Sequence, residues 1–400
     1  MVLCLNFIYL IYLHMNIRKI AVPTLILVVL VFAGIYFYSV RVRFLQAVST
    51  SKVQYNDLAG RKVSITRNVH RIILLRSKDI YELAALLGDE LPKKLVAWGP
   101  DLQTDDKEAY DKFIEKYPSL KEIPVTGSIY SDGLSAEQLV NLHPDLVIAD
   151  RFILDRGYKY VSKLTEAGLP VVYLDGSTDP LTGSQRGITL LGQILGKEAR
   201  AKEIVNYADS QLDIVRDRLI QLHPTAPKVY LEAGSGGPST FSQTYGSAGN
   251  PKEYTSWGAV LHQLRVDNIA DGVVSKQEKI NPEYIIQKDP EIIIITGQHW
   301  TAGNGSMQLG YFITQGKADT LLRSFASRPG WSTLSAIQHH RLYSVFHNTA
   351  IILCFAAVQA LAKDCYPAIF KDLDPEASLR LFYTRFLPIS YSGTWMAGGV

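Results

Sequence analysis

Side chains that could bind a charged or aromatic ligand stand at the ends of several apolar runs, which predict strands. Arg76 follows the run RIILL, and Arg151 follows DLVIAD. Arginine supplies a fixed fork of donors for carboxylate or catecholate oxygens, and tryptophan or tyrosine supplies a stacking face. Each residue could also be an ordinary rim or loop residue. The candidates, which together suit a large, anionic and partly aromatic ligand, are Arg76, Trp98, Tyr130, Arg151, Tyr245, Trp300 and His347.

Two histidines raise the question of a metal. His299 and His347 each follow a predicted strand in the second half of the chain, where they could approach each other and cap a metal complex, or be ordinary loop residues. A bare transition ion usually needs several histidines or carboxylates that converge. The three cysteines form no Cys-x-x-Cys pair. The histidines therefore argue against a site for a bare metal ion, and the sequence predicts no cofactor.

Enzyme motifs are absent from the sequence. It contains no G-x-S-x-G elbow, no Walker A loop and no H-E-x-x-H pair. The run GSGG (234–237) follows a predicted strand but lacks the spacing of a dinucleotide or phosphate loop. We therefore predict no catalytic residue, and a nucleotide-binding enzyme is a minor alternative. The formal net charge is only +3 over 400 residues, without a basic run, so we expect no nucleic-acid partner.

Two halves of alternating strands and helices must position the candidate residues. From residue 60 to 176, short apolar runs alternate with amphipathic stretches, which indicates βα units and a parallel sheet. After Pro224 the alternation resumes with KVYLEAG, EIIIITG and RLYSVFH. The predicted fold class is α/β, with two lobes that each contain a central, mostly parallel sheet. Ligands bind at the carboxyl ends of the strands in such sheets, which is why we chose strand-end residues.

The segment 183–222 separates the two halves. Its apolar residues recur at helical spacing, and no proline interrupts it. It predicts one long connecting helix; the alternative is two helices with a kink near Gly196, because glycine weakens a helix. The predicted boundaries are 51–180 for the first lobe, 181–224 for the connecting helix and 225–400 for the second lobe.

A weak internal repeat relates the two halves. The first contains LSAEQLVNLHPDLVIAD (134–150) and the second INPEYIIQKDPEIIIIT (280–296). When Glu137 is aligned with Glu283, the prolines of the two segments also coincide. Each segment predicts a helix with an acidic start, followed by a proline and a buried strand. The repeat therefore predicts two lobes of similar construction.

From about residue 54 to 347 the sequence resembles a known family. It is similar to the class III solute-binding proteins of ABC importers for iron–siderophores, haem and cobalamin, which have a helical backbone between their lobes. The matching segments, which occur in the family's order, include IPVTGSIYSDGLSAEQLVNLHPDLVIAD, LTEAGLPVVYLD, LLGQILGKEARA and PGWSTLSAIQHHRLYSVF. The resemblance implies two α/β lobes joined by one long helix, an iron complex or related chelate as ligand, ABC permease and ATPase partners, and no enzymatic activity.

The resemblance also assigns a role to two glutamates. In that family, one surface glutamate in each lobe contacts arginines of the permease, and Glu137 and Glu283 match those positions. A carboxylate in the first turn of a helix also complements the helix dipole, which would explain either residue without docking. A membrane-tethered sensor or accessory subunit with the same fold is the main alternative to an importer component.

The N-terminal segment predicts export or anchoring. Residues Ile20 to Val40 contain no charged residue, and about 20 apolar residues can span a bilayer as a helix. We expect residues 1–50 to be a cleaved signal peptide or an uncleaved membrane anchor, with Met15 as an alternative start. No cysteine follows the apolar run until Cys354, which departs from lipoprotein members of the family. The remaining chain should work in the periplasm or at the outer face of the cytoplasmic membrane.

Overall fold

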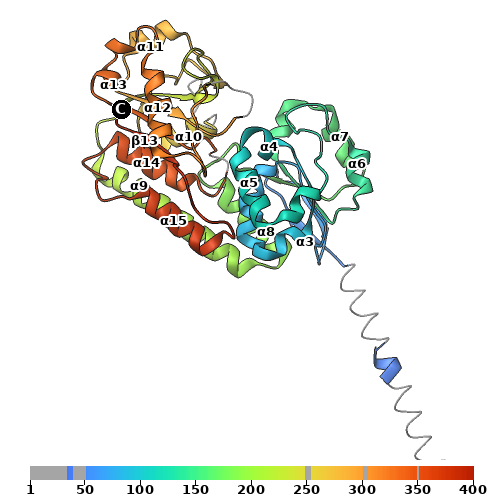
Figure 1. Cartoon of the computed structure of the whole chain (residues 1–400). Coiled ribbons are helices and arrows are strands. Elements are labelled where there is room, and N and C mark those ends of the chain that lie inside the picture. Colours follow the sequence, from blue (N-terminus) through green and yellow to red (C-terminus); the bar gives the residue numbers. More distant parts are fainter. Residues whose placement is uncertain (1–33, 39–50, 248–253, 301–304, 349–350) are drawn as a thin grey trace, which may run out of the picture. The chain divides into compact units, whose positions relative to one another are not determined.

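The structure is a computed structural model that describes residues 34–38, 51–247, 254–300, 305–348 and 351–400 (Figure 1). The chain divides into two compact units: Met1–Val53 with Thr66–Asn68, and Gln54–Ile65 with Val69–Val400. Most of the predicted signal or anchor segment lies outside the described residues. Among those described, no helix is long and apolar enough to cross a membrane. Both lobes belong to the second unit.

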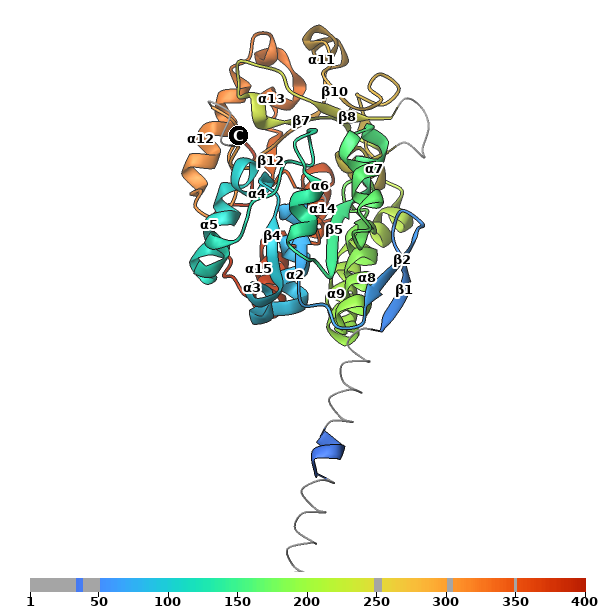
Figure 2. The ribbon, with the colours of Figure 1, turned by 90° about the vertical axis from the view of Figure 1, so that its right-hand side faces the viewer.

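The first lobe contains a 4-stranded parallel sheet in the order β4-β3-β5-β6. Ile72 and Leu74 face the main core, whereas Ile73 and Val147 belong to a second apolar cluster. Helices cover both faces, with α5 and α7 on opposite sides (Figure 2), and the strands are therefore apolar apart from Asp150 at the end of β5. The elements are β3 (Ile72–Leu74), α2 (Ile80–Leu87), α3 (Leu91–Lys94), β4 (Leu95–Trp98), α4 (Asp101–Asp105), α5 (Lys107–Lys116), α6 (Ala136–Asn141), β5 (Leu146–Asp150), α7 (Lys159–Glu166) and β6 (Val171–Leu174), preceded by a hairpin of β1 (Lys52–Asn56) and β2 (Lys62–Thr66).

The second lobe contains a 7-stranded sheet in which β10-β8-β7-β11-β12-β13 are adjacent and β9 pairs with β7. Its central strands β7, β11 and β12 are parallel, and antiparallel strands form its edges. The elements are β7 (Lys228–Ala233), β8 (Thr244–Gly246), α10 (Ser256–Gln263), β9 (Asp267–Asn268), β10 (Lys276–Glu278), α11 (Pro282–Lys288), β11 (Ile292–Thr296), α12 (Gln315–Ala326), α13 (Ser335–Gln338), β12 (Leu342–Val345), α14 (Cys354–Cys365), α15 (Pro375–Phe386) and β13 (Met396–Gly398). The expected α/β fold with two parallel-rich sheets is confirmed.

Two helices, α8 (Gly183–Leu195) and α9 (Glu198–Leu222), occupy the segment between the lobes. The break falls at Gly196, whose φ of 65° is left-handed and ends α8. The chain then turns, and α9 packs back against α8 so closely that a Cβ on Gly192 would lie 2.5 Å from the Cβ of Ala201. The 25-residue helix α9 also lies beside α15, where Tyr207 contacts Phe382 (Figure 1). Helix α9 therefore contacts both α8, which precedes it, and α15, near the C-terminus.

The internal repeat is visible in the backbone. In the first lobe α6 leads into β5, and in the second lobe α11 leads into β11. Each helix is followed by a residue with positive φ directly before the proline: His143 at 44° and Asp289 at 46°. Ser135 caps α6 and Asn281 caps α11 through the side-chain oxygen. The same turn chemistry thus recurs at equivalent positions of the two lobes.

Buried polar contacts also join the lobes. The hydroxyl of Tyr81 in α2 is hydrogen-bonded to that of Tyr311 at 2.9 Å, and Tyr311 is bonded to Tyr383 of α15 at 2.7 Å. Burial raises the pKa of all three hydroxyls, so they remain protonated. Nearby, the backbone N–H of Ile352 donates to Glu82 at 2.8 Å. These contacts tie α2 of the first lobe to the C-terminal part of the second.

Candidate ligand site and docking surface

Arg76 follows β3 and lies at the joint between the lobes. Its side chain is buried and forms ion pairs with Asp79 and, at 3.5 Å, with Asp150. It also donates to the amide oxygen of Asn348, in the second lobe, at 3.3 Å. Burial alone would lower the pKa of Arg76, but the neighbouring carboxylates of Asp79 and Asp150 raise it above its usual value. Arg76 is therefore a permanent cation whose charge is already matched by two carboxylates.

The loop after β3 is held in place by Asp101 at the start of α4. The Asp101 carboxylate accepts hydrogen bonds from the backbone and hydroxyl of Ser77, each at 2.8 Å, and from the Lys78 backbone at 3.1 Å. The Lys78 ammonium forms an ion pair with Asp105 at 3.2 Å. A Cβ at Gly99 would lie 2.2 Å from the backbone oxygen of Leu75, so only glycine permits the two strand ends to approach this closely. This loop fixes Arg76 and Lys78 at the carboxyl edge of the sheet.

Arg151 and Tyr130 occupy the more open side of the first lobe. Arg151 begins the turn after β5, and its half-exposed guanidinium pairs with Asp175 at 3.2 Å. Burial raises the pKa of Asp175 against the opposing effect of its arginine neighbours. The Tyr130 side chain is 44% exposed and stacks on Phe152, with ring centroids 5.4 Å apart. The backbone oxygen of Tyr130 also accepts a hydrogen bond from the Tyr158 hydroxyl at 3.0 Å.

Trp98 and Tyr245 are placed differently from these exposed residues. Trp98 is only 2% exposed and packs against Tyr110 within the first-lobe core. Tyr245 is also 2% exposed, but its ring lies 6.5 Å from that of His347. Trp98 therefore belongs to the packed interior, whereas Tyr245 supports the residues at the edge of the second-lobe sheet.

His347 is the centre of a cluster that three second-lobe segments contribute. It follows β12, and its Nδ1 is hydrogen-bonded to Oγ1 of Thr296, at the end of β11, at 2.7 Å. Trp300 packs edge-on against the imidazole at a centroid distance of 5.0 Å. Burial, and secondarily the charge of Lys78, lowers the pKa of His347 to about 3, so the ring is neutral at physiological pH. The hydrogen bond from Arg76 to Asn348 shows that strand-end residues of the two lobes meet beside this cluster.

The second histidine, His299, makes a different contact. Its Nδ1 lies 3.2 Å from a carboxylate oxygen of Glu108, which is part of α5 in the first lobe. The other Glu108 oxygen accepts the backbone N–H of Phe312 at 2.9 Å. In the structure His299 is thus paired with Glu108, and His347 with Thr296.

Sequence reasoning missed the acidic residues at this joint. Glu82 and Glu108 are buried, and each carboxylate accepts a backbone N–H of the second lobe. Burial raises the pKa of Glu82 to about 7. The run IYELAALL carried a signal, since an acid within an apolar helix needs a partner. Glu108 follows the polar stretch QTDDK, which predicts a solvated surface and gave no comparable signal.

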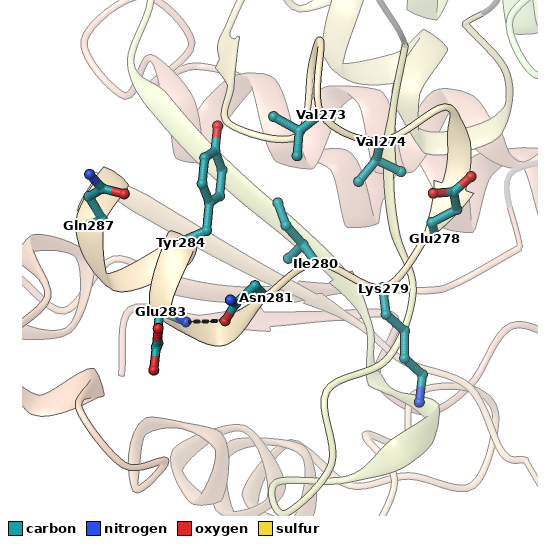
Figure 3. Close-up of a pocket in the computed structure, with 9 residues that line it drawn as sticks. All are labelled: Val273, Val274, Glu278, Lys279, Ile280, Asn281, Glu283, Tyr284 and Gln287. Carbon is teal, nitrogen blue, oxygen red and sulfur yellow. Dashed lines mark hydrogen bonds between the residues drawn. The ribbon is translucent and has the colours of Figure 1, made fainter.

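Both candidate docking glutamates are exposed in the first turn of their helices, Glu137 in α6 and Glu283 in α11. The Ser135 hydroxyl donates to Glu137 at 3.0 Å and lowers the pKa of that carboxyl. The N–H of Glu283 donates to the Asn281 side chain at 2.9 Å. Glu283 also stands at the edge of a surface pocket of about 380 Å³ (Figure 3). The pocket is lined by Val273, Val274, Glu278, Lys279, Ile280, Asn281, Glu283, Tyr284 and Gln287.

The fold and the facing strand ends are those of a two-lobed binding protein, and sequence comparison agrees. A family model described as periplasmic binding protein matches residues 79–347, so the chain belongs to that family. The solved structure of the TroA-like periplasmic binding protein FepB from Veillonella parvula is similar, with a TM-score of 0.78 and 33% identity. That match covers 86% of this chain and 99% of the other.

Two further relatives are known from sequence. An uncharacterized ABC transporter substrate-binding lipoprotein of Bacillus subtilis, YvrC, is 22% identical over 331 residues, 82% of this chain and 90% of YvrC. The molybdate-binding protein MolA of Haemophilus influenzae is 21% identical over 361 residues, 84% of this chain and 91% of MolA. The chain is therefore a solute-binding component of the ABC transporter type, a class that works with permease and ATPase subunits.

Proposed function

We propose that the chain captures an iron complex, such as a ferric siderophore or haem, or a related metal chelate, and delivers it to an ABC permease. The observation that carries the proposal is the presence of one aromatic pair beside the strand ends of each lobe. Tyr130 stacks on Phe152 in the first lobe, and Trp300 packs on His347 in the second. Flat side chains on both sides suit a ligand with flat, partly aromatic groups. A bare ion fits less well, since the described residues contain no group of three or more histidine, cysteine or acidic side chains that could hold one.

The charges at the site refine the expected ligand. Arg76 already pairs with Asp150, and Arg151 already pairs with Asp175. A guanidinium has five N–H donors, so each arginine can share its fork with a ligand oxygen while it keeps its partner. The net attraction for an anion is nevertheless weaker than that of two free arginines. The arginines therefore orient acidic groups of the ligand, and stacking supplies much of the affinity.

His347 supports a metal complex over a metal-free organic ligand. Thr296 Oγ1 lies 3.4 Å from the backbone oxygen of Glu232, to which it can donate its proton. The His347 Nδ1–H then donates to Thr296, which leaves Nε2 with a free lone pair. With a pKa near 3, the ring remains neutral and able to coordinate a metal that has an open position or to accept a hydrogen bond.

Calorimetry with a defined set of probes tests the ligand. Haem, a ferric catecholate siderophore, cobalamin, Zn²⁺ and Mn²⁺ would each be titrated into the protein. We expect tight binding of at least one complex and little binding of either free ion. His347→Gln should weaken that complex, whereas His339→Gln, at an exposed histidine outside the site, should not. Tight Zn²⁺ or Mn²⁺ binding without any bound complex would refute the proposal.

We also propose Glu137 and Glu283 as the contacts for the permease, with the chain outside the cytoplasmic membrane and exported or held by its N-terminal segment. Each exposed ion pair alone contributes about 0–1 kcal/mol, but two pairs formed together fix the orientation of the complex. The double variant Glu137→Ala, Glu283→Ala should reduce uptake at limiting ligand while ligand affinity stays unchanged. Normal uptake by that variant would argue against this docking role.

A further inference from the structure

An exposed aliphatic side chain accompanies each candidate docking glutamate. Val140 lies three residues after Glu137 on α6, and Ile286 lies three residues after Glu283 on α11. Residues three apart are neighbours on the surface of a helix. Val140 and Ile286 are each 38% exposed, less than Val273 at 49% or Leu222 at 54%, but each still reaches the surface. Each lobe thus presents a carboxylate and an aliphatic side chain next to each other.

The two pairs occupy equivalent positions in the repeat. Aligning Glu137 with Glu283 also aligns Val140 with Ile286, and it aligns the positive-φ residues His143 and Asp289 that follow the helices. Of the two intervening positions, the exposed one differs, because Gln138 corresponds to Tyr284, whereas Leu139 and Ile285 are both buried and aliphatic. A scattered surface apolar residue needs no explanation. Recurrence of the same acidic and aliphatic spacing, at matched exposure in both lobes, calls for a common cause.

The second lobe adds a recess beside its pair. The pocket of about 380 Å³ has an apolar side of Val273, Ile280 and Tyr284, and its lining also includes Glu278, Lys279 and Glu283, whose carboxylate points away from the apolar side (Figure 3). Val273 is 49% exposed although its side chain is apolar. The pocket is thus large enough for one side chain and combines apolar walls with negative charge. A partner side chain that is apolar, with a basic residue beside it, matches both properties.

We propose that each lobe docks on the permease through a carboxylate–aliphatic pair, Glu137 with Val140 and Glu283 with Ile286, and that the pocket beside Glu283 receives an apolar side chain of a permease loop. The proposal rests on the docking role of the glutamates. An exposed ion pair is worth little by itself, so charge sets approach and register. Burial of the aliphatic groups supplies affinity that salt does not screen. The partner surface is therefore basic with an apolar residue adjacent, once for each lobe.

Binding to reconstituted permease tests the proposal. The permease–ATPase complex from the same cell would be placed in lipid nanodiscs, and association with the full chain would be followed by biolayer interferometry at low and high salt. Val140→Ser with Ile286→Ser should weaken binding on the order of tenfold at both salt concentrations. Val273→Ser should weaken it in the same salt-independent manner. Glu137→Gln with Glu283→Gln should weaken binding at low salt and abolish most of its salt dependence.

Matched controls separate the outcomes. Ile220→Ser with Leu222→Ser changes two exposed apolar residues of α9 and should leave binding to the permease unchanged. In every variant the melting temperature and the affinity for haem or siderophore should equal those of the parent protein. If the glutamate variant loses affinity but the aliphatic variant does not, the aliphatic contribution is refuted and the docking glutamates stand. If neither matters, both ideas fail. If the parent protein binds empty nanodiscs and the aliphatic variant does not, Val140 and Ile286 contact lipid. If the parent protein self-associates in sedimentation and the variant does not, they contact a second copy of the chain. Either result would overturn the proposal.

Discussion

Replacing Arg76 by alanine should cost stability in a strongly pH-dependent way. Arg76 is the cation between Asp79 and Asp150, and the side chains of all three are at most 4% exposed. Removing one partner of a buried ion pair leaves an uncompensated charge and typically costs about 3–5 kcal/mol. We expect a loss of that size in the free energy of unfolding at pH 7.5, measured by urea denaturation.

The sign of the pH effect follows from Asp79. Burial already raises the pKa of Asp79 above its ordinary value, although Arg76 opposes that shift. Without Arg76 the pKa of Asp79 rises further, so the folded state holds a proton that the unfolded chain releases above about pH 4. Stability of the variant therefore falls more steeply with rising pH than that of the parent protein. The cost of Arg76→Ala should be clearly smaller at pH 4.5 than at pH 7.5.

Two comparisons make this prediction refutable. Arg151→Ala removes a guanidinium that is 40% exposed, and its partner Asp175 keeps Arg186, so the expected cost is only about 0–1 kcal/mol. Adding Asp79→Asn to Arg76→Ala removes one of the stranded charges and should restore part of the stability at pH 7.5. An equal cost of Arg76→Ala at both pH values, or no recovery in the double variant, would show that the charge argument is wrong.

Three further predictions concern the joint and the connecting helices. The pKa of Glu82 is raised to about 7, so its contribution to stability is present at acid pH and lost between about pH 4.5 and 7; Glu82→Gln should flatten that part of the denaturation profile. Gly196→Ala should lower the free energy of unfolding by about 1–2 kcal/mol because of its left-handed φ, whereas Gly316→Ala within α12 should be neutral or stabilising. Small-angle scattering with and without ligand should reveal only modest closure, and Glu108→Gln should increase the change; a large rotation in the parent protein would contradict this.

Local patterns were sufficient for much of the fold. The β-branched run of β11 and the matched helix–proline–strand segments predicted two similar lobes, because burial on both faces of a parallel sheet demands such runs. The break at Gly196 was visible as an alternative. Whether glycine ends a helix there depends on the packing of α8 on α9, to which Gly192 and Ala201 contribute and which no single segment encodes.

The candidate site was less predictable than the fold. Strand-end position selected His347 and Trp300, which contact each other in the structure, but it could not distinguish them from Trp98, which packs in the core against Tyr110. Hydrophobic periodicity and strand order predict at which edge of the sheet a residue lies. The direction of its side chain depends on tertiary packing. The carboxylate partners of Arg76 could not be derived either, since Asp150 is 74 residues away in sequence and comes close only through strand pairing.

The chain of tyrosine hydroxyls has a consequence for how the protein reaches its native state. Tyr81 and Tyr311 are 230 residues apart in sequence, and Tyr383 follows another 72 residues later. Such a contact closes a long loop, and its entropic cost must be met before the bond forms. The chain of hydroxyls at the joint is therefore complete only when Tyr383 of α15 is in place. Each sheet can form from contacts within its own lobe, whereas the hydroxyl chain that joins the lobes needs contacts that span most of the sequence.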